Sequence, residues 1–441
     1  MTELLRAAIF HTPENAFHSA GALRAYTDGA LVIKGGEDAD DRKDNGTILA
    51  CGDYAQLRVE FPEAAVRDLT GSFILPGFVD THIHFPQVRI IGGLGFTLLD
   101  WLEKLTLPEE ARFADPSYAA TIAQEFVRSL ASHGTTTALV FGAHFVESTA
   151  AMFASASATG LRIISGLVLA DRMLRDDLHT TPDRAWRDSN DLMARVANLP
   201  RAGYAVIPRF ALSASEPLLE VCRALLKENP SAYFTSHINE SPQEIEIVAE
   251  LFPWAKDYLD VYEKFDLVGR RSVLAHNIHA KDSEIDRMAK RGATVAHCPC
   301  SNAALGSGIF PMRRHLNHNA RFALGTDVGG GTGFGMLKEA LQSHLLQRLA
   351  VDPLTITPAQ MLYLATRAGA EALEMDSSVG DFTPGKQADY VVIQPRQQSS
   401  LANILKNSPD PERTLGAIFT AASAEDIREV RVGGDLVHEN R

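Results

Sequence analysis

The stretch that decides the fold is Pro76-Gly77-Phe78-Val79-Asp80-Thr81-His82-Ile83-His84, an apolar run that ends in two histidines one residue apart. Side chains on a β-strand alternate between its two faces, so His82 and His84 point to the same side. If this strand belongs to a parallel barrel, its C-terminal end is where catalytic groups gather, and a metal ion fits between the two imidazoles. The His-x-His pattern alone is equally compatible with two surface or core histidines. The remainder of the chain has to decide between these interpretations.

The middle of the chain, residues 76–375, alternates short apolar segments with longer amphipathic ones, which is typical of repeated β-α units. One helix is easy to recognise, since Ser215 can cap it, Pro217 lies in its first turn and apolar residues then recur at helical spacing. Eight candidate strands are what a closed (β/α)₈ barrel requires, so the pattern predicts this α/β fold. The predicted strands are 78–80, 136–140, 162–167, 204–207, 233–236, 272–275, 294–296 and 321–324.

Both ends of the chain consist of short apolar strings separated by glycine and charged residues, which is the spacing of short strands and turns. The strings are 30–33, 48–50 and 72–75 near the start, with a charged run at 37–43, and 388–393, 417–419 and 430–437 near the end. We expect residues 1–75 and 376–441 to form one small β-rich domain together, and residues 76–375 to form the catalytic barrel.

The composition excludes several classes of function. The 441 residues include 42 Lys and Arg against 55 Asp and Glu, a net charge of -13, which argues against nucleic acid as the partner. Cys51, Cys222, Cys298 and Cys300 are too few and too unevenly placed for a disulfide framework. The sequence shows no signal-peptide pattern and no apolar run of roughly 18 residues. We therefore expect a cytoplasmic protein with a small-molecule substrate and without a nucleic-acid or membrane partner.

Polar residues follow the predicted strands at the positions where a barrel gathers its catalytic groups. They are His82 and His84 after the first strand, Arg209 and Phe210 after the fourth, His237 to Glu240 after the fifth, His276 after the sixth, His297 after the seventh and Asp327 after the eighth. Histidines that only pack in a core would not need to follow one strand after another, so their positions favour a metal site. The nitrogens of His82, His84 and His237 together with the carboxylate of Asp327 suit zinc or ferrous iron rather than magnesium or calcium.

Two-metal barrels of this general type place a bridging lysine after the fourth strand. The only lysine between residues 105 and 255 is Lys227, on a predicted helix, so we expect one divalent ion.

A metal with an open position lowers the pKa of bound water toward about 7, which yields hydroxide at neutral pH. Attack on an aromatic amidine-like carbon also needs a proton shuttle beside the metal, and Glu240 has that placement. The alternative interpretation of Glu240 is a solvated loop carboxylate. Asp327 can take the water proton, and His276 can hydrogen-bond the hydroxide or act as a further ligand.

Five motifs occur in an order that resembles the amidohydrolase superfamily. They are the 76–84 stretch, Ser236-His237-Ile238-Asn239-Glu240, Leu274-Ala275-His276, His297-Cys298-Pro299 with Ser301-Asn302, and Gly325-Thr326-Asp327. Within the superfamily, nearly the whole chain resembles the guanine deaminase family. This likeness is carried by Phe85-Pro86-Gln87, Leu99-Asp100-Trp101-Leu102, Pro108-Glu109, Arg112-Phe113 and Pro208-Arg209-Phe210. Two departures, Asn239 where many relatives carry Ser and Cys300 where Asn is common, affect contacts behind the ligands rather than the ligands themselves.

The resemblance implies a distorted (β/α)₈ barrel with a small β-sandwich domain built from both termini, and a homodimer. It implies one zinc ion on His82, His84, His237 and Asp327, with His276 beside the metal or bound to it, and iron as the alternative ion. The implied reaction is the hydrolytic deamination of guanine at C2 to xanthine and ammonia. The implied catalytic residues are Glu240 as proton shuttle, Asp327 and His276.

The resemblance also implies a set of substrate-binding residues. They are His84, Phe85, Pro86, Gln87, Arg209, Phe210, His237, Glu240 and Asp327. Arg209 can donate to the guanine carbonyl oxygen, Gln87 offers a donor and an acceptor to the ring edge, and Phe210 can cover the base plane. A barrel ion pair for Arg209 and core packing for Phe210 are the structural alternatives.

Three further signals and two rival functions stay open. The glycine-rich stretch 328–333 lacks a P-loop ending, and we interpret it as a loop that lets the backbone pass close to Asp327. His144 and His297 also follow strands, but the metal does not need them. Another aromatic deaminase or a chlorohydrolase of the same superfamily is the nearest rival. A non-catalytic scaffold is the second, although a scaffold would need none of the ligands.

Overall fold

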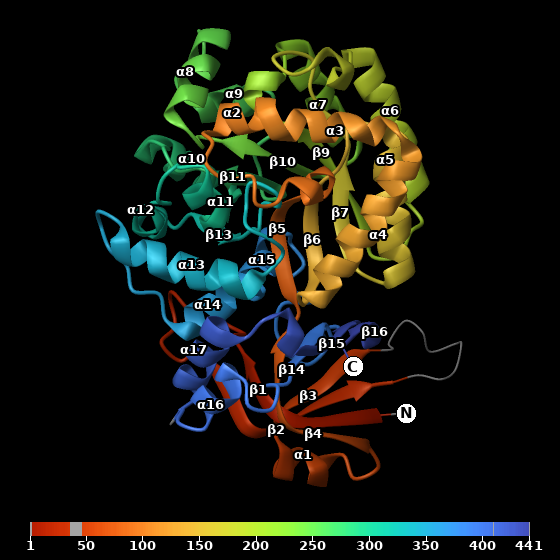
Figure 1. Cartoon of the computed structure of the whole chain (residues 1–441), viewed down its shortest axis with the longest axis vertical. Coiled ribbons are helices and arrows are strands. Elements are labelled where there is room, and N and C mark those ends of the chain that lie inside the picture. Colours follow the sequence, from red (N-terminus) through yellow and green to blue (C-terminus); the bar gives the residue numbers. More distant parts are fainter. Residues whose placement is uncertain (1, 36–45, 409, 441) are drawn as a thin grey trace.

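A computed structural model describes residues 2–35, 46–408 and 410–440, and it consists of a barrel and a smaller β domain (Figure 1). Within those ranges the barrel sheet follows the order β5-β6-β7-β9-β10-β11-β12-β13, and each neighbouring pair is parallel. The strands are β5 (Phe78–His84), β6 (Thr135–Phe141), β7 (Arg162–Gly166), β9 (Ala202–Pro208), β10 (Tyr233–Ile238), β11 (Ser272–His276), β12 (Thr294–His297) and β13 (Arg321–Leu324). A two-residue strand, β8 (Val168–Leu169), pairs with β9 beside this path. The barrel strands predicted from the sequence are confirmed.

The barrel closes where the residues after β13 meet β5. The Asp327 backbone N–H donates to the His82 carbonyl oxygen at 2.8 Å. The buried Asp80 carboxylate accepts hydrogen bonds from the backbone N–H of Thr326 at 3.1 Å and from its hydroxyl at 2.5 Å. Gly325 permits this approach, because a Cβ at that position would lie 2.8 Å from the Cβ of His82. The closure therefore brings the last strand's aspartate beside the first strand's histidines.

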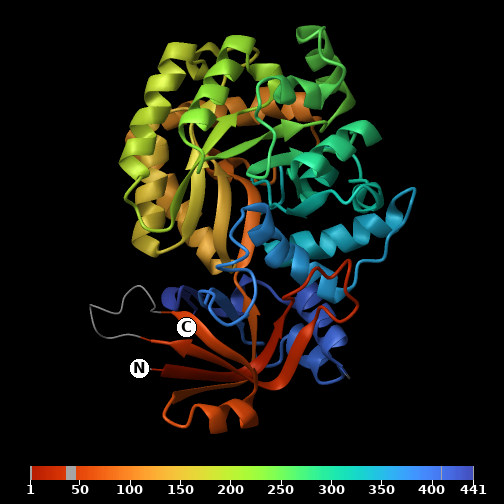
Figure 2. The same cartoon turned by 180° about the vertical axis from the view of Figure 1, so that it is seen from behind.

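Helices surround the barrel on its outer side, as Figures 1 and 2 show from opposite directions. They are α4 (Pro116–Ser132), α5 (Val146–Thr159), α6 (Pro182–Val196), α7 (Glu216–Glu228), α8 (Pro242–Leu251), α9 (Tyr258–Lys264), α10 (Asp282–Arg291), α11 (Pro299–Ala304), α12 (Met312–Asn317), α13 (Met336–Leu349), α14 (Pro358–Ala365) and α15 (Arg367–Ala372). The predicted start of α7 is confirmed, because the Ser215 side chain caps it and Pro217 lies in its first turn.

A run of short helices lies between β5 and α4 and contributes side chains to the pocket described below. It consists of η2 (Phe85–Ile90), α2 (Leu98–Trp101), a π-helical turn η3 (Leu102–Thr106), α3 (Leu107–Ala111) and η4 (Arg112–Ala114). A single π-helical turn inside a helix is frequent near functional sites.

The two ends of the chain form the small β domain together, and both termini lie in it (Figure 1). Its described strands form one mixed sheet in the order β16-β15-β14-β4-β1-β2-β3. They are β1 (Thr2–His11), β2 (Arg24–Lys34), β3 (Thr47–Asp53), β4 (Ala65–Pro76), β14 (Tyr390–Ile393), β15 (Ile427–Val432) and β16 (Asp435–Glu439), with helices α1 (Tyr54–Glu60), α16 (Ser400–Leu405) and α17 (Pro411–Ala421). One side of this sheet has its own apolar core around Leu5, Leu31, Ile74 and Tyr390. The other side joins the barrel core through β14 and β15, and its residues Leu4 and Val32 form a separate cluster with Leu57 of α1.

One expectation for this domain is wrong, since the string 417–419 is part of α17 rather than a strand. Asp410 caps this helix and Pro411 occupies its first turn, and these start signals outweigh a three-residue apolar string that carries no periodicity of its own. The charged run 37–43 lies outside the described residues. The boundaries at 75/76 and 375/376 stay predictions. No helix in the described ranges is both long enough and apolar enough to cross a bilayer.

Candidate active site

Three histidines and one aspartate come together at the C-terminal end of the barrel. The Nε2 atom of His84 lies 3.2 Å from Nε2 of His82, from Nε2 of His237 and from Oδ1 of Asp327. The Nε2 atom of His82 lies 3.3 Å from the same Asp327 oxygen. Ligands at about 2.0–2.1 Å from a tetrahedral metal ion are separated from one another by about 3.3 Å. These four distances therefore match the spacing expected between ligands of a tetrahedral metal ion.

The protonation of these residues also fits a metal. Burial lowers the pKa of His82, lowers the pKa of His84 to about 4 and, with the neighbouring histidines, holds the pKa of His237 well below its usual range. The imidazoles are therefore neutral, which is the form that binds a metal. His237 Nδ1 donates to the Arg209 carbonyl oxygen at 2.5 Å, so its Nε2 lone pair is directed at the cluster.

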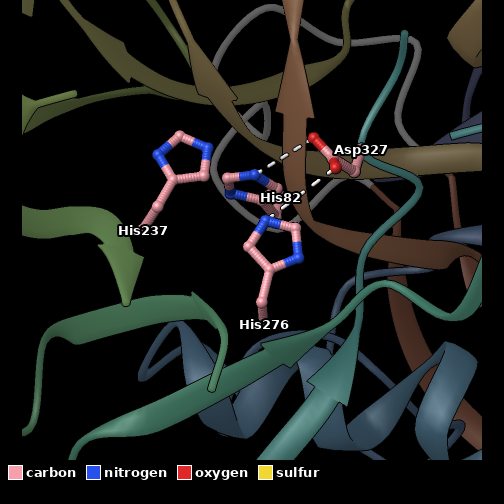
Figure 3. Close-up of side chains that lie close together, drawn as sticks. All are labelled: His82, His237, His276 and Asp327. Carbon is pink, nitrogen blue, oxygen red and sulfur yellow. Dashed lines mark ion pairs between the residues drawn. The ribbon is translucent and has the colours of Figure 1, made fainter. Parts of the chain in front are cut away.

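His276 is the fifth member of this cluster. Figure 3 shows it converging with His82, His237 and Asp327, and one ligand atom from each of these four buried residues lies within 4.8 Å of the others. Its Nε2 lies 3.9 Å from Asp327 Oδ2, a longer separation than those of the set around His84. Its Nδ1 donates to Asn302 Oδ1 at 2.9 Å, which fixes the ring with Nε2 toward the pocket. This placement is compatible with both predicted roles of His276, a further ligand of the metal and a partner of the bound water, and the choice between them stays a prediction.

The strand ends at this site have unusual backbone conformations. His276 has φ 72°, Asp327 has φ 48° and Asn239 has φ 51°, values in the left-handed region that non-glycine residues seldom adopt. Asn tolerates this region better than most residues. The Asn239 amide donates to Asn277 and Glu284, both at 3.1 Å. This local bend is where β10 ends and where Glu240 is turned toward the metal cluster.

Glu240 is buried beside the ligand set rather than in solvent. Its Oε2 lies 3.4 Å from His276 Nε2, and its Oε1 accepts a hydrogen bond from Ser307 Oγ at 3.2 Å. Burial and then the negative charge of Asp327 raise the pKa of Glu240 to about 8. A carboxyl group with such a pKa can both donate and accept a proton near neutral pH, which a proton shuttle requires.

These groups open into one pocket. Its lining residues are His84, Gln87, Leu98, Trp101, Leu102, Arg209, Phe210, His237, Glu240, His276, Leu305 and Asp327. Polar groups that converge in an apolar pocket are typical of a small-molecule site. The sequence assigned no pocket role to the four apolar members, Leu98, Trp101, Leu102 and Leu305, because apolar residues at helical spacing look the same in a core and in a pocket wall. Trp101 and Leu102 belong to a stretch that carries the family likeness, but that stretch did not indicate what they contact.

The side of the pocket formed by Gln87 and Arg209 depends on a residue that the sequence did not reveal. The Arg209 guanidinium and the Gln87 amide both donate to the carboxylate of Glu110, which is buried on α3. Arg209 forms the buried ion pair that was its structural alternative, and it also lines the pocket. Its role in substrate binding stays a prediction. His144, which the metal does not need, lies 3.2 Å from Glu110. Nothing in the sequence separates Glu110 from the other acidic residues.

The remaining predicted residues lie in different places. Phe210 lines the pocket and also belongs to the barrel core, with its ring 6.1 Å from that of His237. Phe85 and Pro86 are buried but are not among the pocket-lining residues, and the Phe85 ring packs against Phe113. The ring of His297 stacks on Phe310, and its two ring nitrogens have no hydrogen-bond partner within the described residues.

The glycine-rich stretch lies against the site, as expected. A Cβ at Gly330 would lie 3.3 Å from Asp327 Oδ2, and a Cβ at Gly331 would clash with the Thr326 carbonyl oxygen at 1.9 Å. The backbone can pass this close to the aspartate only because these residues lack side chains.

Comparison with known proteins adds three findings. The model of the "Amidohydrolase family" matches residues 73–437. The chain is 52% identical over 440 residues to a probable guanine deaminase of Deinococcus radiodurans, and the match covers 99% of this chain and 98% of that protein. Two solved structures, E. coli guanine deaminase and guanine deaminase from Bradyrhizobium japonicum, each align with a TM-score of 0.92 and complete coverage of both chains, at 34% and 32% identity.

Proposed function

We propose that this chain, which belongs to the amidohydrolase family and is a hydrolase of its guanine deaminase group, converts guanine and water into xanthine and ammonia. The observation that carries the proposal is that one pocket is lined by three members of the ligand set, His84, His237 and Asp327, together with Glu240 and the donors of Gln87 and Arg209. The names of the similar proteins, each at more than 30% identity, support the same substrate.

The residues that would hold the ion are His82, His84, His237 and Asp327, and their nitrogen and oxygen donors suit zinc, with iron as the alternative. When bound, a divalent ion would supply a water whose pKa is lowered toward about 7. Asp327 can accept the proton that this water loses. Contacts with His82 and His84 outweigh burial and hold the pKa of Asp327 well below its usual range, so its carboxylate is ionised and carries no proton of its own.

Glu240 moves protons on the substrate side. In its protonated form it can donate to ring nitrogen N3 while a C–O bond forms at C2. The proton that Asp327 accepted then passes to the amino group, the C2–N bond breaks, and ammonia leaves with the electron pair of that bond. The added hydroxyl loses its proton to Glu240 as the C2 carbonyl forms, which restores the protonated form of Glu240. His276 Nε2, 3.4 Å from Glu240 Oε2, can hold the added oxygen by a hydrogen bond. One water is consumed, and xanthine and ammonia are the products.

The purine edge remote from C2 would meet Arg209 and Gln87. Arg209 can donate to the carbonyl oxygen of guanine, and Gln87 can donate through its remaining amide N–H. The Phe210 ring can cover the base plane. The apolar side chains of Leu98, Trp101 and Leu102 limit access of water to the reacting carbon.

The test is ammonia release from guanine with identification of xanthine, alongside a panel of other purines, pterins and pyrimidines and an analysis of metal content. We expect turnover of guanine and about one metal ion per chain.

Arg209→Gln should raise the guanine KM by about tenfold or more with unchanged metal content, because a charged hydrogen bond to the substrate is lost. Preferred turnover of another heterocycle would favour a different aromatic deaminase. Metal without turnover of any compound would favour a scaffold.

Two finer expectations also stay predictions. The homodimer can be tested by gel filtration with light scattering, in which a mass of one chain would contradict it. The cytoplasmic location can be tested by cell fractionation.

A further inference from the structure

Glu110 is a buried carboxylate beside the pocket that the reaction itself does not use. Its Oε1 accepts hydrogen bonds from Gln87 Nε2 at 2.8 Å and from Arg209 Nη1 at 2.8 Å. Its Oε2 accepts from Arg209 Nη1 at 2.6 Å and pairs with His144 Nε2 at 3.2 Å. These contacts come from three donor groups, and Glu110 is buried and is not among the residues that line the pocket. Glu110 can therefore affect a substrate only through the residues that it holds.

The charge of Glu110 is fixed by its surroundings. Burial alone would favour the neutral carboxyl group, but the charge of Arg209 and the hydrogen bonds from His144 and Arg209 outweigh it and keep the pKa of Glu110 well below its usual range. The ionised group only accepts hydrogen bonds. It also compensates the buried guanidinium, which would otherwise be an unpaired charge.

This arrangement determines which atoms of Gln87 and Arg209 face the pocket. The Gln87 amide is bound at both of its ends, because Nε2 donates to Glu110 and Oε1 accepts from the Gly329 backbone N–H at 3.0 Å. Exchanging the amide oxygen and nitrogen would place two acceptors together and two donors together. Glu110 is also the sole hydrogen-bond partner of the Arg209 side chain among the described residues. The groups left for a ligand are therefore N–H donors from both residues.

We propose that Glu110 is a specificity-determining positioning residue, which holds Arg209 and Gln87 as hydrogen-bond donors and so selects a purine with an acceptor at C6 over one with an amino group there. The proposal rests on the proposed function, since it names the feature of guanine that this side of the pocket recognises. A 6-oxo group accepts from the fixed donors. A 6-amino group would place N–H against N–H and leave buried donors unpaired.

The experiment compares the wild-type holoenzyme with Glu110→Gln in guanine turnover and in the binding of hypoxanthine and adenine, which carry the 6-oxo and the 6-amino group. The Gln side chain keeps the size but has one acceptor atom and cannot accept from all three donor groups, so Gln87 and Arg209 lose their fixed orientation. We expect the guanine KM to rise by about tenfold or more with a kcat change of less than about threefold. The preference for hypoxanthine over adenine should fall by about tenfold or more, with metal content unchanged.

Glu109→Gln is the matched control, because it is the same substitution at the neighbouring position of α3. Glu109 contacts Arg112 and Tyr118 rather than the pocket residues. We expect the wild-type KM and the wild-type hypoxanthine preference in this variant. Glu110→Asp keeps the charge but retracts it by one methylene, so it should give effects of the same kind that are smaller than those of Glu110→Gln.

The outcomes separate the two proposals. A folded, metal-loaded Glu110→Gln protein with wild-type KM and wild-type hypoxanthine preference would overturn the role of Glu110. If that variant does not fold, Glu110→Asp is judged by the same two measurements. If the wild-type protein does not deaminate guanine, the proposed function fails. Calorimetric binding of hypoxanthine and adenine to both proteins then still decides whether Glu110 controls the C6 preference.

Discussion

Two buried carboxylates in this protein pair with arginine in opposite ways. Glu110 lies beside the pocket, and within the described residues the Arg209 guanidinium bonds to it alone. Asp381 lies between α15 and β14 and accepts from Arg367, from Lys386 and from both the backbone and the hydroxyl of Thr383. The second cluster ties the last barrel helix to the segment that enters the small β domain.

The difference lies in the donors that each arginine has left over. Arg367 also bonds to Glu371 at 2.8 Å and faces Asp376 at 3.7 Å, so carboxylates surround it. The Arg209 side chain has N–H groups that Glu110 does not use, and it lines the pocket. A buried ion pair therefore indicates function only where it leaves donors or acceptors directed into a cavity. A fully surrounded pair indicates a structural junction.

We expect the largest effect from a substitution that removes the proton shuttle and leaves the clusters around Glu110 and Asp381 intact. Glu240→Gln should lower kcat for guanine by about a thousandfold, since general acid-base catalysis typically contributes about 10²–10⁴. Metal content and melting temperature should stay close to wild type, because the amide has the same shape. Steady-state kinetics and metal analysis are the measurements. Retention of more than about a tenth of the wild-type kcat would contradict the shuttle role.

Asp381→Asn should act in the opposite way, on stability rather than on catalysis. Removing the charge leaves Lys386 and Arg367 partly uncompensated in a buried place, and we expect a loss of roughly 3–5 kcal/mol of unfolding free energy. The kcat and KM of the protein that stays folded should be unchanged. Asp376→Asn is the control, because Asp376 is partly exposed and faces Arg367 at 3.7 Å. Equal stability of the two variants would refute the comparison.

The cluster around Asp381 can also be tested through the pH dependence of the unfolding free energy, because the buried His11 lies near it. Burial lowers its pKa to about 4, with Asp381 opposing this shift and Arg24 and Lys386 adding to it. The unfolded chain binds a proton near about pH 6.5 and the folded one only near about pH 4, so stability falls as the pH drops through this window. His11→Asn should remove roughly 2 kcal/mol of the stability difference between about pH 8 and about pH 5. Denaturant unfolding at both pH values is the measurement, and an unchanged difference would disprove the role of His11.

The smallest effect concerns the contact that orients the shuttle. Ser307→Ala removes the hydrogen bond from Ser307 Oγ to Glu240 Oε1. A bond of this kind contributes about 1 kcal/mol, so kcat should fall by about three- to tenfold, with little change in KM. Rescue of kcat by Ser307→Thr, which keeps a hydroxyl, would separate this hydrogen bond from a change in packing. A kcat at the wild-type value in Ser307→Ala would show that Ser307 does not orient Glu240.

Much of the barrel and of the ligand set could be predicted from the sequence. The alternation of short apolar and longer amphipathic segments reflects strand and helix periodicity, which is a local property of the chain. His82 and His84 share a face because residues i and i+2 of a strand always do. The string 417–419 was assigned wrongly, because three apolar residues carry too little periodicity to distinguish a strand from a helix.

The sequence by itself determined which barrel strands carry the candidate metal-site residues at their ends: histidines after the first, fifth and sixth strands and an aspartate after the eighth. It did so because a parallel barrel places each strand's C-terminal residue at the same end. Only the tertiary structure decided which groups touch. Glu110 meets Gln87 and Arg209 across 23 and 99 positions of the chain. Such contacts depend on how helices and loops pack, and local sequence does not encode a packing partner that lies far away along the chain.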